Sequence, residues 1–295
     1  MNGVLIAGGD IRYIRLAEIF AGMGADVFIC GSNSEFINNK KIRSDLSFSD
    51  AVKDTNLIVL PIPASCDGMT ISTPLSDDKL YLSDIYENAL PDAIVVGGII
   101  DTEEFKKHSV TAYDYTVRDD FACMNAAATC EGALLHAMQI TDITVSGSKS
   151  LVTGFGRIAQ IMAKTLAALG SEVTVCARSN AALSLAAAYG YKIQNLTALS
   201  YAVQNCDFIF NTVPSLLFDL NVLLRVGKKC PLIDLASAPG GVDYVSADSL
   251  GINAALLPGI PGKYSPQTAA ETIAEVIFNI ICESGKDAST WICRA

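Results

Sequence analysis

Apolar residues in the first part of the chain alternate between short continuous runs and a stripe with helical spacing. The runs lie at residues 4–7, 25–31, 57–60 and 93–96. They are bounded by turn residues, which is typical of buried strands. The stripe after the first run consists of Leu16, Ile19, Phe20 and Met23. This spacing gives a helix one apolar face, and Gly24 ends it.

The pattern starts again after a helical stretch at residues 129–140. Strands are predicted at residues 150–153, 172–177, 208–211, 232–234 and 254–257. The run at 150–153 is followed by a helical stripe of Ile158, Ile161, Met162, Thr165, Leu166 and Leu169, and a last helix is predicted from about residue 268 to 284. Strands that alternate with helices predict parallel sheets covered on both faces.

The chain of 295 residues has room for about two domains. We therefore expect an α/β protein with two parallel-sheet domains. Residues 1–140 would form a flavodoxin-like or Rossmann-like α/β domain for the substrate, and residues 141–267 a Rossmann domain for NAD(P). We expect the C-terminal helix, residues 268–295, to return and complete the first domain.

Composition and charge narrow the possible partners. The chain has 31 acidic and 21 basic residues, a net charge of −10, which argues against binding nucleic acid or an anionic membrane surface. No apolar run is long enough to span a bilayer, and the N-terminus has no signal-peptide pattern. The nine scattered cysteines fit a reducing cytosol, and with only two histidines no metal site is expected.

One motif carries the cofactor prediction. Gly154-Phe155-Gly156-Arg157-Ile158-Ala159 has the pattern G-x-G-x-x-A between a predicted strand and a predicted helix. Gly154 would allow the tight turn, Gly156 would admit a pyrophosphate, and Ala159 would keep helix and strand close. The helix N-terminus would direct free N–H groups at the phosphates. A glycine turn that only packs is the alternative.

The end of the next strand selects the dinucleotide. An NAD site usually has an acidic residue there, whereas this chain has Ala177-Arg178-Ser179. Arg178 and Ser179 are suited to a 2′-phosphate, so NADP is favoured over NAD. The alternative is that Arg178 is a solvated surface residue.

Later strand ends should line the nicotinamide side, since ligands bind at the carboxyl ends of parallel strands. The candidate contacts are Thr212, Val213, Pro214, Ala236, Ser237 and Pro258. Their prolines also fit ordinary turns.

The first strand also ends in a glycine turn, Gly8-Gly9-Asp10, but without the full fingerprint. With Arg12 close by, this helix N-terminus would hold a substrate carboxylate. An ordinary turn with Asp10 as the helix cap explains the same residues equally well.

The chain resembles the A subunit of dipicolinate synthase from residue 3 to about 280. The resemblance is carried by Gly8-Gly9-Asp10-x-Arg12, Arg118-Asp119-Asp120, Glu131-Gly132, Gly154-Phe155-Gly156-Arg157, Asn211-Thr212-x-Pro214, Asp234-Leu235-Ala236-Ser237-x-Pro239-Gly240-Gly241-x-Asp243 and Pro258-Gly259-x-Pro261-Gly262. Tyr13 and Cys130 depart from the expected pattern.

This resemblance implies an enzyme that, with a flavoprotein-like B subunit, forms dipicolinate from a dihydrodipicolinate-type substrate. It also implies sporulation and the mother-cell cytoplasm of a spore-forming bacterium. A homo-oligomer is a further option.

Aromatising the ring requires removal of a hydride and a proton, so a general base is needed. Candidate acid–base residues are Glu131, Asp120 and His136, and candidate anion holders are Arg12, Arg118 and Lys263, with Ser265 and Thr268 as neutral donors. Each acid–base candidate has a plainer explanation: Glu131 as a first-turn acid, Asp120 as part of an exposed charge cluster, and His136 as a packing residue.

Three other interpretations stay open. A D-2-hydroxyacid dehydrogenase would use a histidine late in the cofactor domain as its acid–base residue. No histidine follows His136, so this chain lacks that residue. A reductase similar to shikimate or alanine dehydrogenase is compatible with Asn211-Thr212-x-Pro214. A non-catalytic nucleotide-binding protein is also compatible, because the residues alone do not identify the base.

Overall fold

The computed structural model describes residues 3–285, which form two compact units. The first unit contains residues 3–124 and 265–285, and the second contains residues 125–264. The predicted domain change near residue 140 lies at the end of helix α5 (Asp119–Gln139), whereas the units divide within that helix, between Met124 and Asn125.

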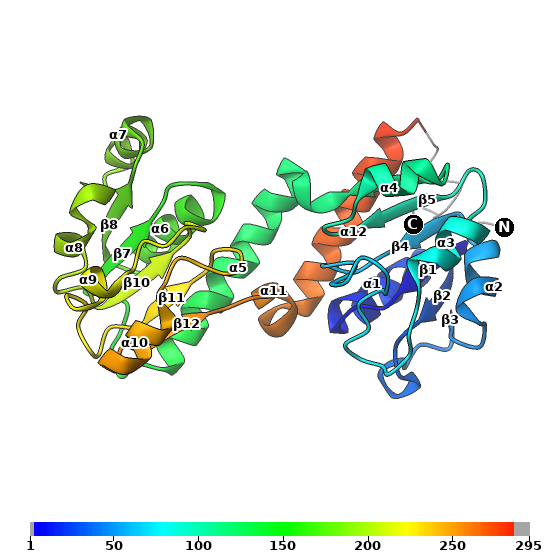
Figure 1. Cartoon of the computed structure of the whole chain (residues 1–295), viewed down its shortest axis with the longest axis horizontal. Helices are drawn as coiled ribbons and strands as arrows, with labels where there is room; N and C mark the ends of the chain where they lie inside the picture. Colours follow the sequence, from blue (N-terminus) through cyan, green and yellow to red (C-terminus); the bar gives the residue numbers. More distant parts are fainter. Residues whose placement is uncertain (1–2, 286–295) are drawn as a thin grey trace. The chain divides into compact units, whose positions relative to one another are not determined.

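The first unit is built on a six-stranded parallel sheet in the order β3-β2-β1-β4-β5-β6 (Figure 1). The strands are β1 (Gly3–Ala7), β2 (Asp26–Cys30), β3 (Ile42–Arg43), β4 (Leu57–Val59), β5 (Ile94–Gly97) and β6 (Thr111–Asp114). The helices are α1 (Ile11–Gly22), α2 (Phe48–Lys53), α3 (Leu82–Asn88), α4 (Thr102–Lys107), the start of α5, and α12 (Pro266–Glu283), with 3-10 turns η1 (Ser34–Phe36) and η2 (Tyr115–Val117).

Alternate strand residues of this sheet face two separate cores. Val4, Ile6 and Val59 pack with α1 and α12, while Leu5 and Ile58 pack with α2, α3 and α4. The apolar stripe of α12 comes from more than 240 residues away along the chain and contacts α1 directly. The sequence predicts such a return of the last helix; residues 286–295 of the predicted segment lie outside the described part.

The second unit repeats the same topology, with the order β12-β11-β10-β7-β8-β9. The strands are β7 (Lys149–Thr153), β8 (Glu172–Ala177), β9 (Lys192–Asn195), β10 (Phe208–Asn211), β11 (Leu232–Asp234) and β12 (Ala254–Leu256). The helices are α6 (Arg157–Ala168), α7 (Asn180–Ala188), α8 (Leu199–Ala202), α9 (Leu220–Leu223), α10 (Tyr244–Leu250) and α11 (Ile260–Tyr264), with the 3-10 turn η3 (Leu196–Ala198).

Both sheets are wholly parallel, so the predicted α/β class with two Rossmann-like sheets is confirmed. Because all strands of a sheet run the same way, their carboxyl ends lie at one edge. Ligands of such folds bind at this carboxyl edge. Within residues 3–285, no helix is both long and apolar enough to cross a bilayer.

Candidate functional site

The turn after β7 has the shape that a dinucleotide needs. Gly154 has a φ of +83°, and a Cβ there would lie 2.7 Å from the Thr212 hydroxyl oxygen. Gly156 is the N-cap of α6 with an ordinary φ of −79°, and a Cβ there would meet no protein atom within 4 Å. The packing of the protein therefore explains Gly154 but not Gly156. The open space at Gly156, in front of the first N–H groups of α6, fits a pyrophosphate.

The other residues of this turn support it from within the protein. The Phe155 side chain is buried, with its ring centroid 6.2 Å from those of Tyr189 and Tyr191. Ala159 is completely buried. Cys130 of α5 donates to the Ile158 carbonyl at 3.4 Å, and burial raises the pKa of its thiol to about 12. These side chains fix the turn, so its backbone at Gly156 and the start of α6 is the part that would meet a ligand.

The end of β8 presents a cation and a hydroxyl. Arg178 is exposed, and Ser179 caps α7 by accepting the Ala182 N–H at 3.4 Å. The Ser179 O–H proton has no acceptor among the described residues and is free for a ligand. No acidic side chain follows this strand before α7.

A row of buried polar side chains closes the three central strands of the second unit. Thr153, Asn211 and Asp234 end β7, β10 and β11, pair in register, and are all completely buried. The Thr153 hydroxyl donates to the Asn211 Oδ1, and the Asn211 amide donates to the Asp234 Oδ1 at 2.8 Å.

This row holds the first residues of the neighbouring loops. The Asn211 Oδ1 accepts the Val213 N–H at 3.1 Å, and the Asp234 Oδ1 accepts the Ala236 N–H at 3.0 Å. The Thr212 hydroxyl donates to the Thr153 carbonyl at 2.7 Å. The predicted contacts therefore lie at the carboxyl ends of their strands, namely Thr212, Val213 and Pro214 after β10, Ala236 and Ser237 after β11, and Pro258 after β12.

Asp234, Tyr244 and Gly241 were not among the predicted site residues. The Asp234 Oδ2 accepts the Tyr244 O–H and the Gly241 N–H, both at 2.7 Å, and burial together with this contact raises the pKa of Tyr244. A Cβ on Gly241 would lie 2.7 Å from the Val213 carbonyl oxygen. In the sequence, the feature that could have identified Asp234 is the polar residue at the end of each of three apolar strands.

A second group of predicted residues meets where α5 packs on α11. A Cβ on Gly132 would overlap Ile260, so this glycine admits the close approach of the two helices. The His136 Nδ1 lies 3.3 Å from the Tyr264 hydroxyl, and the Lys263 ammonium lies 5.1 Å from the centre of the Tyr264 ring. Glu131 is exposed on α5.

In the first unit, Asp10 and Arg12 bind each other. Arg12 is 6% exposed and donates to both Asp10 oxygens, at 2.9 and 2.8 Å. Asp10 also caps α1 by accepting the Arg12 N–H at 3.0 Å. Beside them, the buried Tyr13 and Tyr115 hydroxyls lie 2.6 Å apart, and burial raises the pKa of both.

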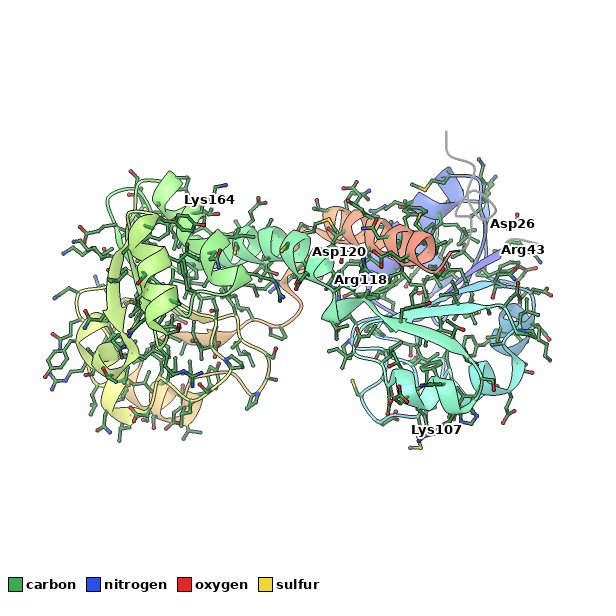
Figure 2. All side chains as sticks on the ribbon, turned by 90° about the horizontal axis from the view of Figure 1, so that it is seen from above. Asp26, Arg43, Lys107, Arg118, Asp120 and Lys164 are labelled. Atoms are coloured by element: carbon green, nitrogen blue, oxygen red, sulfur yellow. The ribbon has the colours of Figure 1, made fainter. Side chains whose placement is uncertain are left out.

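Arg118 and Asp120 form a clamp between the start of α5 and the end of α12 (Figure 2). Arg118 donates to Asp120 at 2.8 Å and to Glu283 at 2.6 and 2.9 Å, while Asn279 donates to Asp120 at 3.1 Å. The guanidinium holds the pKa of Asp120 well below its usual range. Asp120 is therefore a weak proton acceptor, and both residues serve to join two helices.

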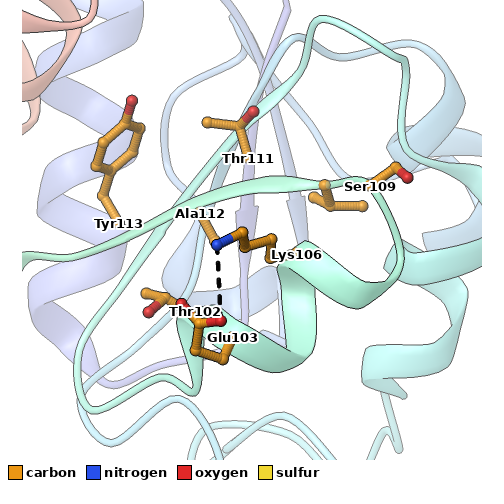
Figure 3. Close-up of a pocket in the computed structure, with 8 residues that line it drawn as sticks. Thr102, Glu103, Lys106, Ser109, Thr111, Ala112 and Tyr113 are labelled. Atoms are coloured by element: carbon orange, nitrogen blue, oxygen red, sulfur yellow. Dashed lines mark ion pairs between the residues drawn. The ribbon is translucent and has the colours of Figure 1, made fainter.

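Two cavities of the first unit differ in their relation to these residues. One, of about 590 Å³, lies at the carboxyl edge and is lined by Gly9, Asp10, the apolar residues Pro61, Ile62, Pro63, Ile71 and Pro74, and the polar residues Cys66, Asp67, Thr70, Ser72 and Thr73. The other, of about 480 Å³, lies between α4 and β6 around the Glu103–Lys106 ion pair and contains none of the predicted residues (Figure 3).

Comparison with known proteins places this geometry in a family. Residues 3–116 match the family described as the N-terminal domain of the dipicolinate synthase A subunit. The chain is 31% identical to the A subunit of dipicolinate synthase from Bacillus subtilis, over 95% of this chain and 96% of that protein. The chain belongs to the dipicolinate synthase A-subunit family. The predicted resemblance is thus confirmed.

Solved structures agree with the assignment to the dipicolinate synthase A-subunit family. The crystal structure of the A subunit from Bacillus halodurans matches with a TM-score of 0.84 and 30% identity, covering 95% of this chain and 97% of that one. The A-subunit structure from Bacillus subtilis has the same TM-score and identity, with 96% coverage of both chains.

The second unit carries its own match. Residues 125–218 match the NAD-binding domain of D-isomer-specific 2-hydroxyacid dehydrogenases. A transhydrogenase from Sinorhizobium meliloti shares the fold, with a TM-score of 0.68 at 14% identity over 96% of this chain and 94% of that one. This member of the dipicolinate synthase A-subunit family is therefore a dehydrogenase-type subunit whose second unit binds a nicotinamide dinucleotide.

Proposed function

We propose that this chain carries out the NADP-dependent oxidation of a dihydrodipicolinate-type substrate to dipicolinate. The observation that carries the proposal is the similarity over nearly the whole chain to the dipicolinate synthase A subunit, so that both units are shared. The reaction removes a hydride and a proton from the ring and leaves an aromatic pyridine dicarboxylate. A bound nicotinamide dinucleotide would supply the acceptor for the hydride, and a base of the protein would take the proton.

The cofactor residues follow from the second unit. Gly154, Gly156 and the start of α6 would hold the pyrophosphate, and Arg178 with Ser179 would bind the 2′-phosphate. The loops after β10, β11 and β12 would receive the nicotinamide half. When bound, the oxidised nicotinamide supplies the hydride acceptor.

Among the three acid–base candidates, we assign proton removal to His136. Asp120 is engaged by Arg118 and has a depressed pKa, and Glu131 is exposed to water. His136 is half-buried and fixed by the Tyr264 hydroxyl 3.3 Å from its Nδ1. That contact orients the ring and leaves Nε2 for the substrate. Histidine is the side chain most often used for such transfers.

The substrate carboxylates require cations or hydrogen-bond donors. Arg12 and Arg118 already neutralise Asp10, Asp120 and Glu283 of the chain itself. Lys263 has no ion pair among residues 3–285 and lies on the same tyrosine as His136. We therefore propose that Lys263 binds a substrate carboxylate. Asp10, Arg12 and Arg118 would instead shape the carboxyl edge of the first unit.

The relatives are named as A subunits, and we propose that a flavoprotein-like B subunit completes the enzyme. The enzyme would act in the mother-cell cytoplasm during sporulation, as the resemblance implies.

The test is dipicolinate formation by the purified chain with NADP and freshly generated dihydrodipicolinate, with and without the candidate B subunit. NADPH and the pyridine product should appear in equal amounts. Cofactor binding without product under either condition would overturn the substrate assignment. In the active enzyme, His136→Gln should lower kcat with little change in NADPH affinity, whereas Glu131→Gln should leave kcat near its original value.

A further inference from the structure

The Asp234 carboxylate is buried without a cation. Its two oxygens accept hydrogen bonds from the Asn211 amide, the Ala236 and Gly241 N–H groups and the Tyr244 hydroxyl. None of these groups is charged, and Asp234 forms no ion pair in the described part of the chain. All four partners act as donors, so both carboxylate oxygens serve as acceptors.

These four hydrogen bonds join segments that are separate in the sequence. Asn211 in turn accepts the Val213 N–H and donates to the Val213 carbonyl, both at 3.1 Å. Asp234 thus reaches the loop after β10 through Asn211 and the loop after β11 through Ala236 and Gly241. Tyr244 adds the first residue of α10.

The sheet itself does not require this polar row. The first unit has the same strand order, and its strands β1, β4 and β5 correspond to β7, β10 and β11. They end in the buried residues Ala7, Val59 and Gly97, none of which has a polar side chain. Burying a carboxylate costs free energy unless hydrogen bonds offset the loss of water. The row is therefore specific to the unit that binds the dinucleotide.

We propose that Asp234 is a positioning residue that holds the loops after β10 and β11 in the shape that receives the nicotinamide half of the cofactor. It acts through Asn211 and Tyr244, and its four hydrogen bonds do not include the phosphate turn at residues 154–156. The inference rests on dinucleotide binding by the second unit and is independent of the substrate and of the choice between NADP and NAD.

Substitution by asparagine tests the role of the carboxylate. An asparagine side chain has one acceptor oxygen in place of two, and its amide would face N–H donors. Asp234→Asn should therefore release one of the two loops. Tyr244→Phe removes a single hydrogen bond on the outside of the cluster and should be milder.

The experiment measures dissociation constants for the full chain by calorimetry with two kinds of probe. NADPH and NADH contain the nicotinamide half, whereas 2′,5′-ADP and ADP contain only the adenosine half. We expect Asp234→Asn to lower the affinity for whichever dinucleotide binds more tightly by about tenfold or more. Tyr244→Phe should lower the same affinity by about threefold. The corresponding adenosine probe should change less than about twofold in both variants.

Asp243→Asn is the matched control, because Asp243 caps α10 through Ser246 and makes no contact with the row. It should leave every constant unchanged. Equal weakening of dinucleotide and adenosine probes would show a general structural role and overturn the proposal, as would unchanged dinucleotide binding in both variants. If Asp234→Asn does not fold, Tyr244→Phe decides between these outcomes. Loss of dipicolinate synthesis alone, with these affinities as expected, would concern the proposed reaction and not this inference.

Discussion

The two units share one sheet topology but differ at the first turn after their central strand. In the second unit the turn after β7 leaves the Gly156 backbone open. In the first unit the turn after β1 is covered: the Gly9 N–H donates to the Ser72 carbonyl at 2.9 Å, and a Cβ on Gly8 would overlap that same carbonyl. The N–H that would face a phosphate is therefore used within the protein. Strand order alone does not make a nucleotide site; the segment lying over the turn decides.

The strand ends differ in the same sense. The second unit closes β7, β10 and β11 with hydrogen-bonded Thr153, Asn211 and Asp234, whereas β1 ends in buried Ala7. The second unit thus hydrogen-bonds its loops to the strand ends, whereas the first unit has a cavity at its carboxyl edge that is lined by both apolar and polar residues.

The largest effect is expected at the open turn. Gly156→Val should weaken dinucleotide binding by at least about hundredfold, or roughly 3 kcal/mol, because the new side chain fills the space in front of α6. Valine is compatible with the φ of −79°, so the fold should survive. Gly227→Val is the control, since Gly227 is exposed and a Cβ there would have its nearest neighbour 3.9 Å away, at Cys230. Unchanged binding by Gly156→Val in fluorescence titration would refute the fingerprint assignment.

The covered turn should respond in the opposite way. Gly8→Ala forces a φ of +71° on alanine and a clash with Ser72, so we expect about 2–3 kcal/mol less free energy of unfolding. Urea denaturation followed by circular dichroism measures the loss. Hydrogen exchange should locate it in the first unit while dinucleotide affinity stays normal. If exchange rises equally in both units, the contrast between the two turns is not the cause.

Arg178, at the end of β8, allows the nucleotide site of the second unit to be tested by changing the ligand. Arg178→Ala should weaken the binding of NADPH by about 2 kcal/mol and leave the binding of NADH nearly unchanged, because only NADPH carries the 2′-phosphate. Arg225→Ala, another exposed arginine of the second unit, is the control. Equal weakening of both dinucleotides by Arg178→Ala would argue against the NADP assignment.

The smallest effect concerns the clamp of Arg118 and Asp120 in the first unit. Asp120→Asn should lower the free energy of unfolding at pH 7 by about 1 kcal/mol, since the pair is partly exposed. The folded-state pKa of Asp120 lies below its unfolded value, so its contribution is present above the unfolded pKa and is lost as the pH falls toward the folded pKa. The difference in the free energy of unfolding between the unsubstituted protein and Asp120→Asn should therefore shrink below about pH 4.

Denaturation at pH 7 and pH 3 measures this difference. Asp26→Asn, at an exposed acid at the start of β2, should cost little at either pH. A difference for Asp120→Asn that stays constant with pH would mean that the carboxylate charge is not involved.

The interior strands, the edge strand β12 and the phosphate turn were predictable from the sequence, whereas the other three edge strands were not. The predicted runs include β1, β2, β4, β5 and all of the second sheet except β9. The missed strands β3, β6 and β9 are edge strands. The residues of β6 and β9 are exposed or half-buried, and polar residues such as Thr111 and Lys192 interrupt any apolar run there.

The residues of the candidate site also differ in how far the sequence predicts them. The Gly154–Gly156 turn and Arg178 were predictable, because each is recognised from the spacing of residues that are close together in the chain. The contacts of Arg118 with Glu283 and of Asn211 with Asp234 join residues 165 and 23 positions apart, and only the fold brings them together.

The return of α12 has a consequence for the order in which the protein matures on the ribosome. The second unit has all of its residues once Tyr264 has been made, and it can fold as soon as that segment leaves the exit tunnel. The first unit, although its sheet is synthesised earlier, waits for Ile273, Ile277 and Ile280 to cover α1. The half of the protein that is translated first is thus completed last, and until then the apolar face of α1 is available to chaperones.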